Sequence, residues 1–231
     1  MGSLKKFYVV KVGRKTGIFN TWEECKEQIN GFSGAKFKGF NTKEEAEAFF
    51  LGAEKTVKCE AYAYTDGSYN EDEKMTGGGG IIYLNGNQYP FITKTDDADF
   101  VNMRNVGGEI LAAMAAVEYA KELGINSLCI FHDYEGVGSW AKGDWKTNKV
   151  ATKGYAEFMK SCDLSLDYKK VEAHSGVEEN EEADDLAKYA VGVIDNIEHN
   201  YVADVDFTIQ NGKYNFKILY KNIDFEEYFE K

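Results

Sequence analysis

Apolar positions in the first fifty residues are spaced as in a small unit of three strands and two helices. Each predicted helix opens on a capping box, Thr21 with Glu24 and Thr42 with Glu45, and ends at a glycine. The strands are expected at residues 7–12, 18–20 and 35–40. The order is therefore β-β-α-β-α, in a unit too small to bury much core.

From residue 61 onward the pattern becomes that of a mixed sheet flanked by helices. Tyrosine and alanine alternate from Ala61 to Tyr64, as in a strand, and the alternation breaks at Asp66. The other expected strands are 81–84, 89–93, 127–132 and 168–173, and the expected helices are 108–123, 136–141, 153–162 and 180–194, with a loop at 96–106. Three antiparallel strands followed by alternating helices and strands predict an α/β fold with a mixed five-stranded sheet.

The last part of the chain carries a second hairpin signal. Two strand-like runs, 206–210 and 213–220, flank Asn211-Gly212, and a short helix is expected at 224–230. This extension could cover a strand at the sheet edge, mediate dimerisation or lengthen a binding surface, and a structural cover is the default expectation. The sequence does not indicate an oligomeric state.

Charge is divided unevenly between the two parts. Residues 1–58 carry 11 Lys or Arg against 7 Asp or Glu, whereas residues 59–231 carry 16 against 32. The total of −12 would by itself argue against a nucleic-acid-binding protein, but a basic module joined to an acidic one removes that objection. We divide the chain into 1–51, a linker at 52–59, a main domain at 60–194 and an extension at 195–231.

Cysteine spacing and hydropathy indicate the cellular environment. The four cysteines form no Cys-x-x-Cys pair, which argues against a zinc site and a disulfide framework and fits a reducing cytoplasm. No apolar run reaches the length of a membrane span, and the first residues lack the core of a signal peptide. The sequence therefore predicts a soluble cytoplasmic protein.

Aromatic residues and cations are interleaved in the first unit. Phe37 stands between two lysines, and Arg14 and Lys15 lie in the turn after the first strand, a pattern typical of nucleic-acid surfaces. About half of such aromatic residues in a small domain are simply core. The stretch FYVVKVGRKTGIFNTWEECKEQINGFSGAKFKGF resembles the hybrid-binding domain of type 1 ribonucleases H and caulimovirus viroplasmins.

That resemblance implies two binding features in the first unit. The residues matching the family's pocket for a DNA phosphate are Tyr8, Trp22, Phe37 and Lys38. Loop backbone groups around Ser33 to Ala35 would contact RNA 2′-hydroxyls, which distinguish RNA from DNA. Gly39 departs from the pattern because a second lysine often stands there, which weakens the expected phosphate contact.

Acidic residues of the main domain lie at strand ends and helix starts. Asp66 and Asp133 each follow a predicted strand, Glu109 stands in the first turn of a helix, and Asp184 and Asp185 lie in the last helix. Singly, Asp66 reads as a turn residue, Glu109 as a favourable acid near a helix N-terminus, and the acidic run before Asp184 as a solvated face. Together they could converge only around cations, and hard oxygen ligands suit Mg²⁺ or Mn²⁺.

The motifs carrying these acids resemble those of the ribonuclease H catalytic domain. They are TDGSYN, NVGGEILAA, IFHDYEGV and AHSGVEENEEADDLAK. The resemblance implies two-metal cleavage of the RNA strand of RNA/DNA hybrids, with Asp66, Glu109, Asp133 and Asp184 as metal ligands. Helical periodicity does not choose between Asp184 and Asp185. The choice of Asp184 follows the family's spacing from the loop histidine.

Two further residues receive roles from the same resemblance. His174 would assist proton transfer or product release, and Asn105 would contact ribose 2′-hydroxyls. The chain departs from the family at Tyr134 and Glu135, where Ser is common after the acid, and at Val106, where a second asparagine is common. It also lacks a lysine-rich protrusion, so we expect the first unit to supply the missing substrate affinity.

The function expected from the sequence is endonucleolytic hydrolysis of the RNA strand of hybrids, leaving 5′-phosphate and 3′-hydroxyl ends. The expected partner is the RNA/DNA hybrid, with double-stranded RNA as a second ligand of the first unit and no membrane. The alternatives are a non-catalytic protein that binds hybrid or double-stranded RNA, and a nuclease of the same fold that acts on DNA or structured RNA.

Overall fold

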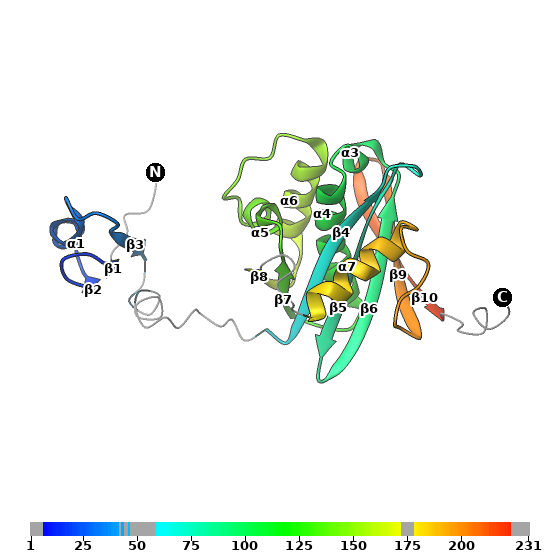
Figure 1. Cartoon of the computed structure of the whole chain (residues 1–231), viewed down its shortest axis with the longest axis horizontal. Coiled ribbons are helices and arrows are strands. Elements are labelled where there is room, and N and C mark those ends of the chain that lie inside the picture. Colours follow the sequence, from blue (N-terminus) through cyan, green and yellow to red (C-terminus); the bar gives the residue numbers. More distant parts are fainter. Residues whose placement is uncertain (1–6, 42, 44–45, 47–58, 172–177, 223–231) are drawn as a thin grey trace. The chain divides into compact units, whose positions relative to one another are not determined.

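The computed structural model describes residues 7–41, 43, 46, 59–171 and 178–222 (Figure 1). The chain forms two compact units, Met1–Lys58 and Cys59–Lys231, and each is described by itself. The first unit's expected second helix starts at the Thr42 capping box, and only residues 43 and 46 of it are described. The expected helix at 224–230 lies outside the described residues.

In its described residues, the first unit is a three-stranded antiparallel sheet with helix α1 (Trp22–Ile29). Its strands are β1 (Phe7–Val12), β2 (Gly17–Phe19) and β3 (Lys36–Phe40), in the order β2-β1-β3. Helix α1 begins with the predicted capping box, because Thr21 accepts from the Glu24 amide and the Glu24 carboxylate accepts from the Thr21 amide. Val9, Val10 and Cys25 are fully buried. The predicted order of these elements is confirmed.

In its described part, the second unit contains the five expected strands, and the expected C-terminal hairpin joins them to make one sheet of seven strands. The strand order is β10-β9-β6-β5-β4-β7-β8. The strands are β4 (Ala61–Asn70), β5 (Met75–Leu84), β6 (Asn87–Thr95), β7 (Ser127–His132), β8 (Ser165–Lys170), β9 (Tyr201–Gln210) and β10 (Lys213–Asn222). Strands β4, β5 and β6 are antiparallel neighbours, and β7 and β8 extend the sheet in parallel from β4. The mixed character of the sheet is confirmed.

The two additional strands come from the C-terminal hairpin. Strand β9 pairs in parallel with β6, with Phe91 opposite Ala203, and β10 pairs with β9 along its whole length. Ala203, Val205 and Phe207 enter the same core cluster as β6 and helix α4 (Asn105–Glu122). The extension therefore covers the edge of β6, as the default expectation held, and belongs to the main core.

Helices pack on both faces of the sheet, and the glycine run 77–80 explains how closely they approach. A Cβ on Gly78 would lie 2.5 Å from Ala112 Cβ in α4, and a Cβ on Gly79 would lie 2.3 Å from the Ala187 amide nitrogen in α7 (Glu178–Ala190). Neighbouring strand residues point to opposite faces, so α4 and α7 lie on opposite sides of β5 (Figure 1). The glycines therefore belong to the interior of β5 and do not precede it as expected.

The remaining helices and strand boundaries differ modestly from the expectation. Helix α3 (Ala98–Val101), opened by an Asp97 cap, lies inside the segment expected to be a loop. Helices α5 (Glu135–Lys142) and α6 (Val150–Ser161) follow β7. Strand β8 starts and ends three residues before the expected strand at 168–173, because it pairs with β7 from Ser127 to His132.

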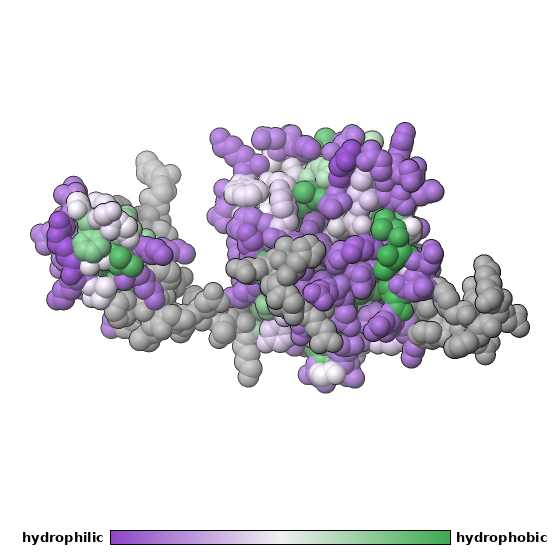
Figure 2. Space-filling view, in the orientation of Figure 1, coloured by the Kyte–Doolittle hydropathy of each residue, from purple (hydrophilic) through white to green (hydrophobic). Residues whose placement is uncertain are grey.

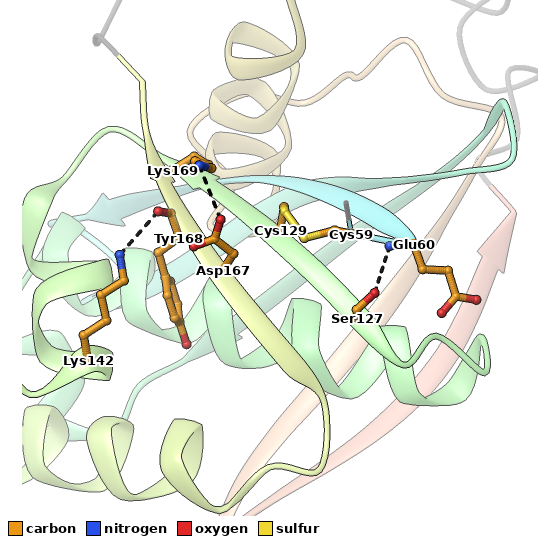
Figure 3. Close-up of a disulfide and its surroundings, with 8 residues drawn as sticks. All are labelled: Cys59, Glu60, Ser127, Cys129, Lys142, Asp167, Tyr168 and Lys169. Atoms are coloured by element: carbon orange, nitrogen blue, oxygen red, sulfur yellow. Dashed lines mark hydrogen bonds and ion pairs between the residues drawn. A yellow bond between two sulfur atoms is a disulfide. The ribbon is translucent and has the colours of Figure 1, made fainter. Parts of the chain in front are cut away.

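A disulfide joins Cys59 to Cys129, so the expectation that cysteine spacing argues against disulfides is wrong. The two Cα atoms are 5.7 Å apart. Parallel pairing of β4 with β7 sets Tyr62 beside Cys129, and the Glu60 amide donates to Ser127 Oγ at 2.9 Å (Figure 3). A separation of 70 residues along the chain is thus closed by sheet pairing, which cysteine spacing does not reveal.

The surface of the second unit is largely polar. Most of the visible face of the second unit is hydrophilic, with apolar surface in limited areas (Figure 2). Among the described residues, no helix combines the length and apolarity needed to cross a membrane.

Candidate active site

Two acids lie at neighbouring parallel strands, Asp66 within β4 and Asp133 directly after β7. Pairing of β4 with β7 ends at Tyr64 opposite Phe131, and Asp66 and Asp133 each follow two residues later. Asp66 does not end its strand, because β4 continues beside β5 as far as Asn70. It lies instead where the β7 partner stops, and this places it at an edge of the parallel pair.

The third acid is buried in α4, but not in its first turn as expected, because the helix begins four residues earlier, at Asn105. Glu109 is only 5% exposed, and two glycines bring its helix against β4. A Cβ on Gly67 would lie 2.2 Å from the Glu109 amide nitrogen, and a Cβ on Gly108 would lie 2.1 Å from the Gly77 carbonyl oxygen. Contact this close between backbones holds Glu109 beside Asp66.

Asp66, Glu109 and Asp133 converge on one point. One carboxylate oxygen from each residue lies within 4.8 Å of the other two. Burial, followed by repulsion from Asp133, raises the pKa of Asp66 from its ordinary 3.8 to about 6. Burial, followed by repulsion from Asp66 and Asp133, holds the pKa of Glu109 well above its ordinary value. Burial and mutual repulsion therefore both favour the protonated forms of Asp66 and Glu109.

Two features of the cluster suit a hard divalent cation: its ligands are all carboxylate oxygens, and one of these oxygens has no hydrogen-bond partner. All three residues offer carboxylate oxygens, which Mg²⁺ and Mn²⁺ prefer. Glu109 Oε2 is buried and has no hydrogen-bond partner. A buried carboxylate oxygen left without a partner is costly, and a bound cation would remove that cost.

The fourth acid of the expected set lies beside the cluster, on α7. Asp184 Oδ2 accepts from Lys188 Nζ at 2.6 Å, and the Asp184 charge contributes to the raised pKa of Asp66. Asp185 is exposed. Asp184 thus lies toward the other acids and Asp185 does not. Helical periodicity alone does not distinguish these two residues.

A cavity of about 350 Å³ adjoins the segment after Asp133. Its lining combines aromatic rings with cations, namely Tyr134, Trp140, Arg104, Lys146 and Lys149. Tyr134, Trp140 and Trp145 pack with ring centroids 5.7 to 6.4 Å apart. Sequence reasoning missed this basic and aromatic surface because its members come from three separate segments. Asn105, the expected ribose contact, is the exposed first residue of α4.

The aromatic residues expected to bind nucleic acid in the first unit do come together. Trp22 lies 5.5 Å from Tyr8 and 5.7 Å from Phe37, measured between ring centroids, and Trp22 and Phe37 are 38% and 46% exposed. Lys38 leaves the opposite face of β3 from Phe37 and lies over the Phe40 ring at 5.7 Å. Gly39 pairs with Tyr8 on the aromatic face.

The other expected site residues fall partly outside the described chain. Ser33 is exposed in the loop before β3, and Ala35 closes that loop with its amide directed to the Phe32 carbonyl. His174 lies outside the described residues. His132, which the sequence analysis did not single out, is buried directly before Asp133, and burial lowers its pKa.

Comparison with known proteins agrees with this geometry. A family model described as RNase H matches residues 59–192, and a model described as Ribonuclease H1 N-terminal domain matches residues 6–50. The first match covers more than half of the chain. The chain belongs to the ribonuclease H family.

Individual relatives of this ribonuclease H cover different portions of it. Ribonuclease H1 of Homo sapiens is 28% identical over 254 residues, covering 79% of this chain and 88% of that protein. Ribonuclease H of Saccharomyces cerevisiae is 54% identical over 51 residues, covering 22% of this chain and 14% of that protein. A solved structure, LC11-RNase H1 in complex with RNA/DNA hybrid, is 19% identical with a TM-score of 0.47, covering 58% of this chain and 97% of that one.

Family membership assigns the general activity of this ribonuclease H. It is a hydrolase of the family that cleaves the RNA strand of RNA/DNA hybrids, and it carries the hybrid-binding domain of ribonuclease H1 at its N-terminal side. Family membership and the carboxylate cluster together indicate dependence on a divalent metal.

Proposed function

We propose that this ribonuclease H cuts hybrids endonucleolytically with two Mg²⁺ ions, leaving 5′-phosphate and 3′-hydroxyl ends, and that Mn²⁺ can replace Mg²⁺. The observation that carries the proposal is the convergence of Asp66, Glu109 and Asp133 within 4.8 Å, with an unsatisfied buried oxygen among them. Such a set of acids is electrostatically unfavourable unless cations compensate it.

The four acids of the motifs are the proposed metal ligands. Asp66, Glu109, Asp133 and Asp184 would hold two cations, with Asp184 exchanging its Lys188 contact for a metal. Bound divalent cations would activate water on one side of the phosphodiester and stabilise the leaving oxygen on the other. The helix and strand that carry Glu109 and Asp66 are held by backbone contact, so these two carboxylates need little rearrangement.

Substrate binding would use both units. In the first, Tyr8, Trp22 and Phe37 would pack against a DNA sugar and phosphate, and the loop from Ser33 to Ala35 would contact RNA 2′-hydroxyls. Lys38 would reach a phosphate from the opposite face of β3. In the second, the cavity with Arg104, Lys146 and Lys149 would neutralise phosphates beside the acids.

The remaining assignments follow from the motifs. Asn105 would contact a ribose 2′-hydroxyl, and His174 would assist proton transfer or product release. Double-stranded RNA is a second proposed ligand of the first unit. The proposed location is cytoplasmic, whereas a disulfide such as Cys59–Cys129 persists mainly in oxidising compartments.

The decisive experiment compares labelled duplexes with the intact chain. We expect cleavage of the RNA strand of a hybrid in Mg²⁺, no cleavage of matched double-stranded DNA or double-stranded RNA, and no activity in EDTA. End analysis should find 5′-phosphate and 3′-hydroxyl groups. Equal cleavage of all three duplexes would reject the proposed substrate.

Removal of the first unit should weaken hybrid binding. A chain that starts at Cys59 lacks the aromatic cluster and the basic segment, so we expect weaker affinity and a shallower dependence on salt. The slope of log K against log salt should fall by about 0.9, the value for a B-form duplex, for every phosphate that the shortened chain no longer neutralises. Fluorescence anisotropy with a catalytically inactive variant, with and without residues 1–58, measures both quantities.

Retaining Cys59 in that shortened chain preserves the disulfide, so a change in binding reports on the first unit. Trp22→Ala in the full chain is the matched control, because it removes one ring of the cluster and no charge. It should lower affinity and leave the salt slope nearly unchanged. Equal affinity and equal slope for the shortened and full chains would remove the binding role from the first unit.

A further inference from the structure

His132 is buried directly before Asp133 and has a specific hydrogen-bond partner. The residue is 2% exposed, and its ring centroid lies 6.5 Å from that of Tyr168. Its Nδ1 lies 2.9 Å from the Tyr134 carbonyl oxygen. A carbonyl oxygen only accepts hydrogen bonds, so Nδ1 must carry the proton and donate.

This hydrogen bond spans Asp133. The imidazole belongs to the residue before the acid, and the carbonyl belongs to the residue after it. On the near side, the His132 carbonyl accepts from the Val171 amide at 2.9 Å, beyond the end of β8. On the far side, the Tyr134 carbonyl also accepts from the Val137 amide at 3.1 Å, in the first turn of α5. The backbone is therefore held on both sides of Asp133.

Helix α5 is held at its start by an exposed ion pair between Lys170 and Glu135, 3.3 Å apart, and by packing of the Tyr134 ring on Trp140. Its N-cap residue, Tyr134, makes no side-chain capping hydrogen bond. A further contact in the first turn of α5 is made by Val137, whose carbonyl accepts from the buried Tyr155 hydroxyl at 2.9 Å. The direction of the Asp133 side chain thus depends on how the segment from 132 to 134 is held, and His132 supplies the side-chain hydrogen bond there.

We propose that His132 is a positioning residue, whose Nδ1–H holds the Tyr134 carbonyl and thereby directs the Asp133 carboxylate toward Asp66 and Glu109. The inference rests on the proposed function of the cluster as a cation site. It concerns hydrogen bonding and not contact with substrate. Partners that orient a metal ligand from behind it typically contribute 10- to 100-fold to metal affinity.

The test compares His132→Asn with His132→Leu in the full chain. Asparagine and leucine have nearly the same shape, and the asparagine amide nitrogen stands close to the place of Nδ1. Both variants lose similar packing, but only the first can donate to Tyr134. We expect Mn²⁺ affinity near that of the unchanged protein for His132→Asn and a loss of about tenfold or more for His132→Leu. Calorimetric titration or electron paramagnetic resonance of free Mn²⁺ gives this affinity without turnover.

Cleavage and stability complete the test. Raising Mg²⁺ should restore hybrid cleavage by His132→Leu, while both variants should lose similar thermal stability. His132→Gln, whose amide reaches the position of Nε2, should behave like His132→Leu and serves in its place if leucine prevents folding. Equal Mn²⁺ affinities for the asparagine and leucine variants would overturn the inference. If the unchanged protein binds no Mn²⁺ and cuts no hybrid, the proposed function fails and this inference fails with it.

Discussion

Replacement of Asp66 by asparagine should abolish cleavage and at the same time stabilise the protein in the absence of metal. Loss of a central carboxylate removes charge stabilisation worth several kcal/mol, so hybrid cleavage in Mg²⁺ should fall by about a thousandfold or more. Hybrid binding should persist, because the aromatic and basic surfaces are unchanged. Cleavage of labelled hybrid and anisotropy measure the two effects.

The stabilising effect follows from the raised pKa of Asp66, about 6 in the folded protein against an ordinary 3.8. A folded-state pKa above the unfolded value means that ionised Asp66 lowers stability at pH values above about 6. This penalty disappears as the pH falls toward 3.8. At pH 7 in EDTA, Asp66→Asn should therefore increase the free energy of unfolding by roughly 1–3 kcal/mol.

Two comparisons keep the Asp66 prediction specific. Mg²⁺ should raise the unfolding temperature of the unchanged protein and have little effect on Asp66→Asn. Asp185→Asn removes an exposed acid next to Asp184 and should cleave normally. Near-normal cleavage by Asp66→Asn would sink the assignment of the acid cluster.

Replacement of Gly67 by alanine should damage both stability and catalysis. A Cβ at this position would lie 2.2 Å from the Glu109 amide nitrogen, 2.4 Å from the Asn105 carbonyl oxygen and 2.7 Å from the Gly108 carbonyl carbon. All three are backbone atoms, so the first turn of α4 must move away from β4. We expect a loss of about 3 kcal/mol in unfolding free energy. Urea unfolding measures it.

Gly86→Ala provides the matched control for Gly67→Ala. Gly86 lies in the turn between β5 and β6 with a φ of +80°, and a Cβ there meets no atom within 4 Å. Its alanine variant bears only the cost of a left-handed backbone, about 1–2 kcal/mol, and should cleave hybrids normally. If the two variants lose equal stability and both cleave normally, the close contact between α4 and β4 has no role in forming the site.

The order of motifs along the chain predicted which acids converge, and the structure shows three of them together. Asp66 and Asp133 lie close together because β4 and β7 pair in parallel, although Asp66 stands inside β4 and not at the strand end that the sequence predicts. Glu109 was found from its motif, but its burial depends on Gly67 and Gly108. A contact between backbones from distant segments leaves no periodic signal, so the sequence showed those glycines only as part of the motifs.

The features that sequence reasoning missed are those created by pairing across long separations. The strand expected at 81–84 begins earlier, because the two helices that pack on the glycine run 77–80 require it inside β5. The tail covers a sheet edge as expected, but the sequence does not show that β9 also completes the core beside β6. Lys146, Lys149 and Trp140 meet Arg104 only through the packing of α5 and α6 against α4. A local sequence pattern does not encode such contacts between distant segments.

The bond between Cys59 and Cys129 closes a covalent ring from β4 through β5, β6 and α4 to β7. Asp66 and Glu109 lie inside this ring, and Asp133 lies four residues beyond it. A protease cut at an exposed turn within the ring, such as Asn85-Gly86, would leave one covalent molecule and not two fragments. Until a reductant opens the ring, such a nicked chain would hold the strand and the helix that carry Asp66 and Glu109 at a high effective concentration.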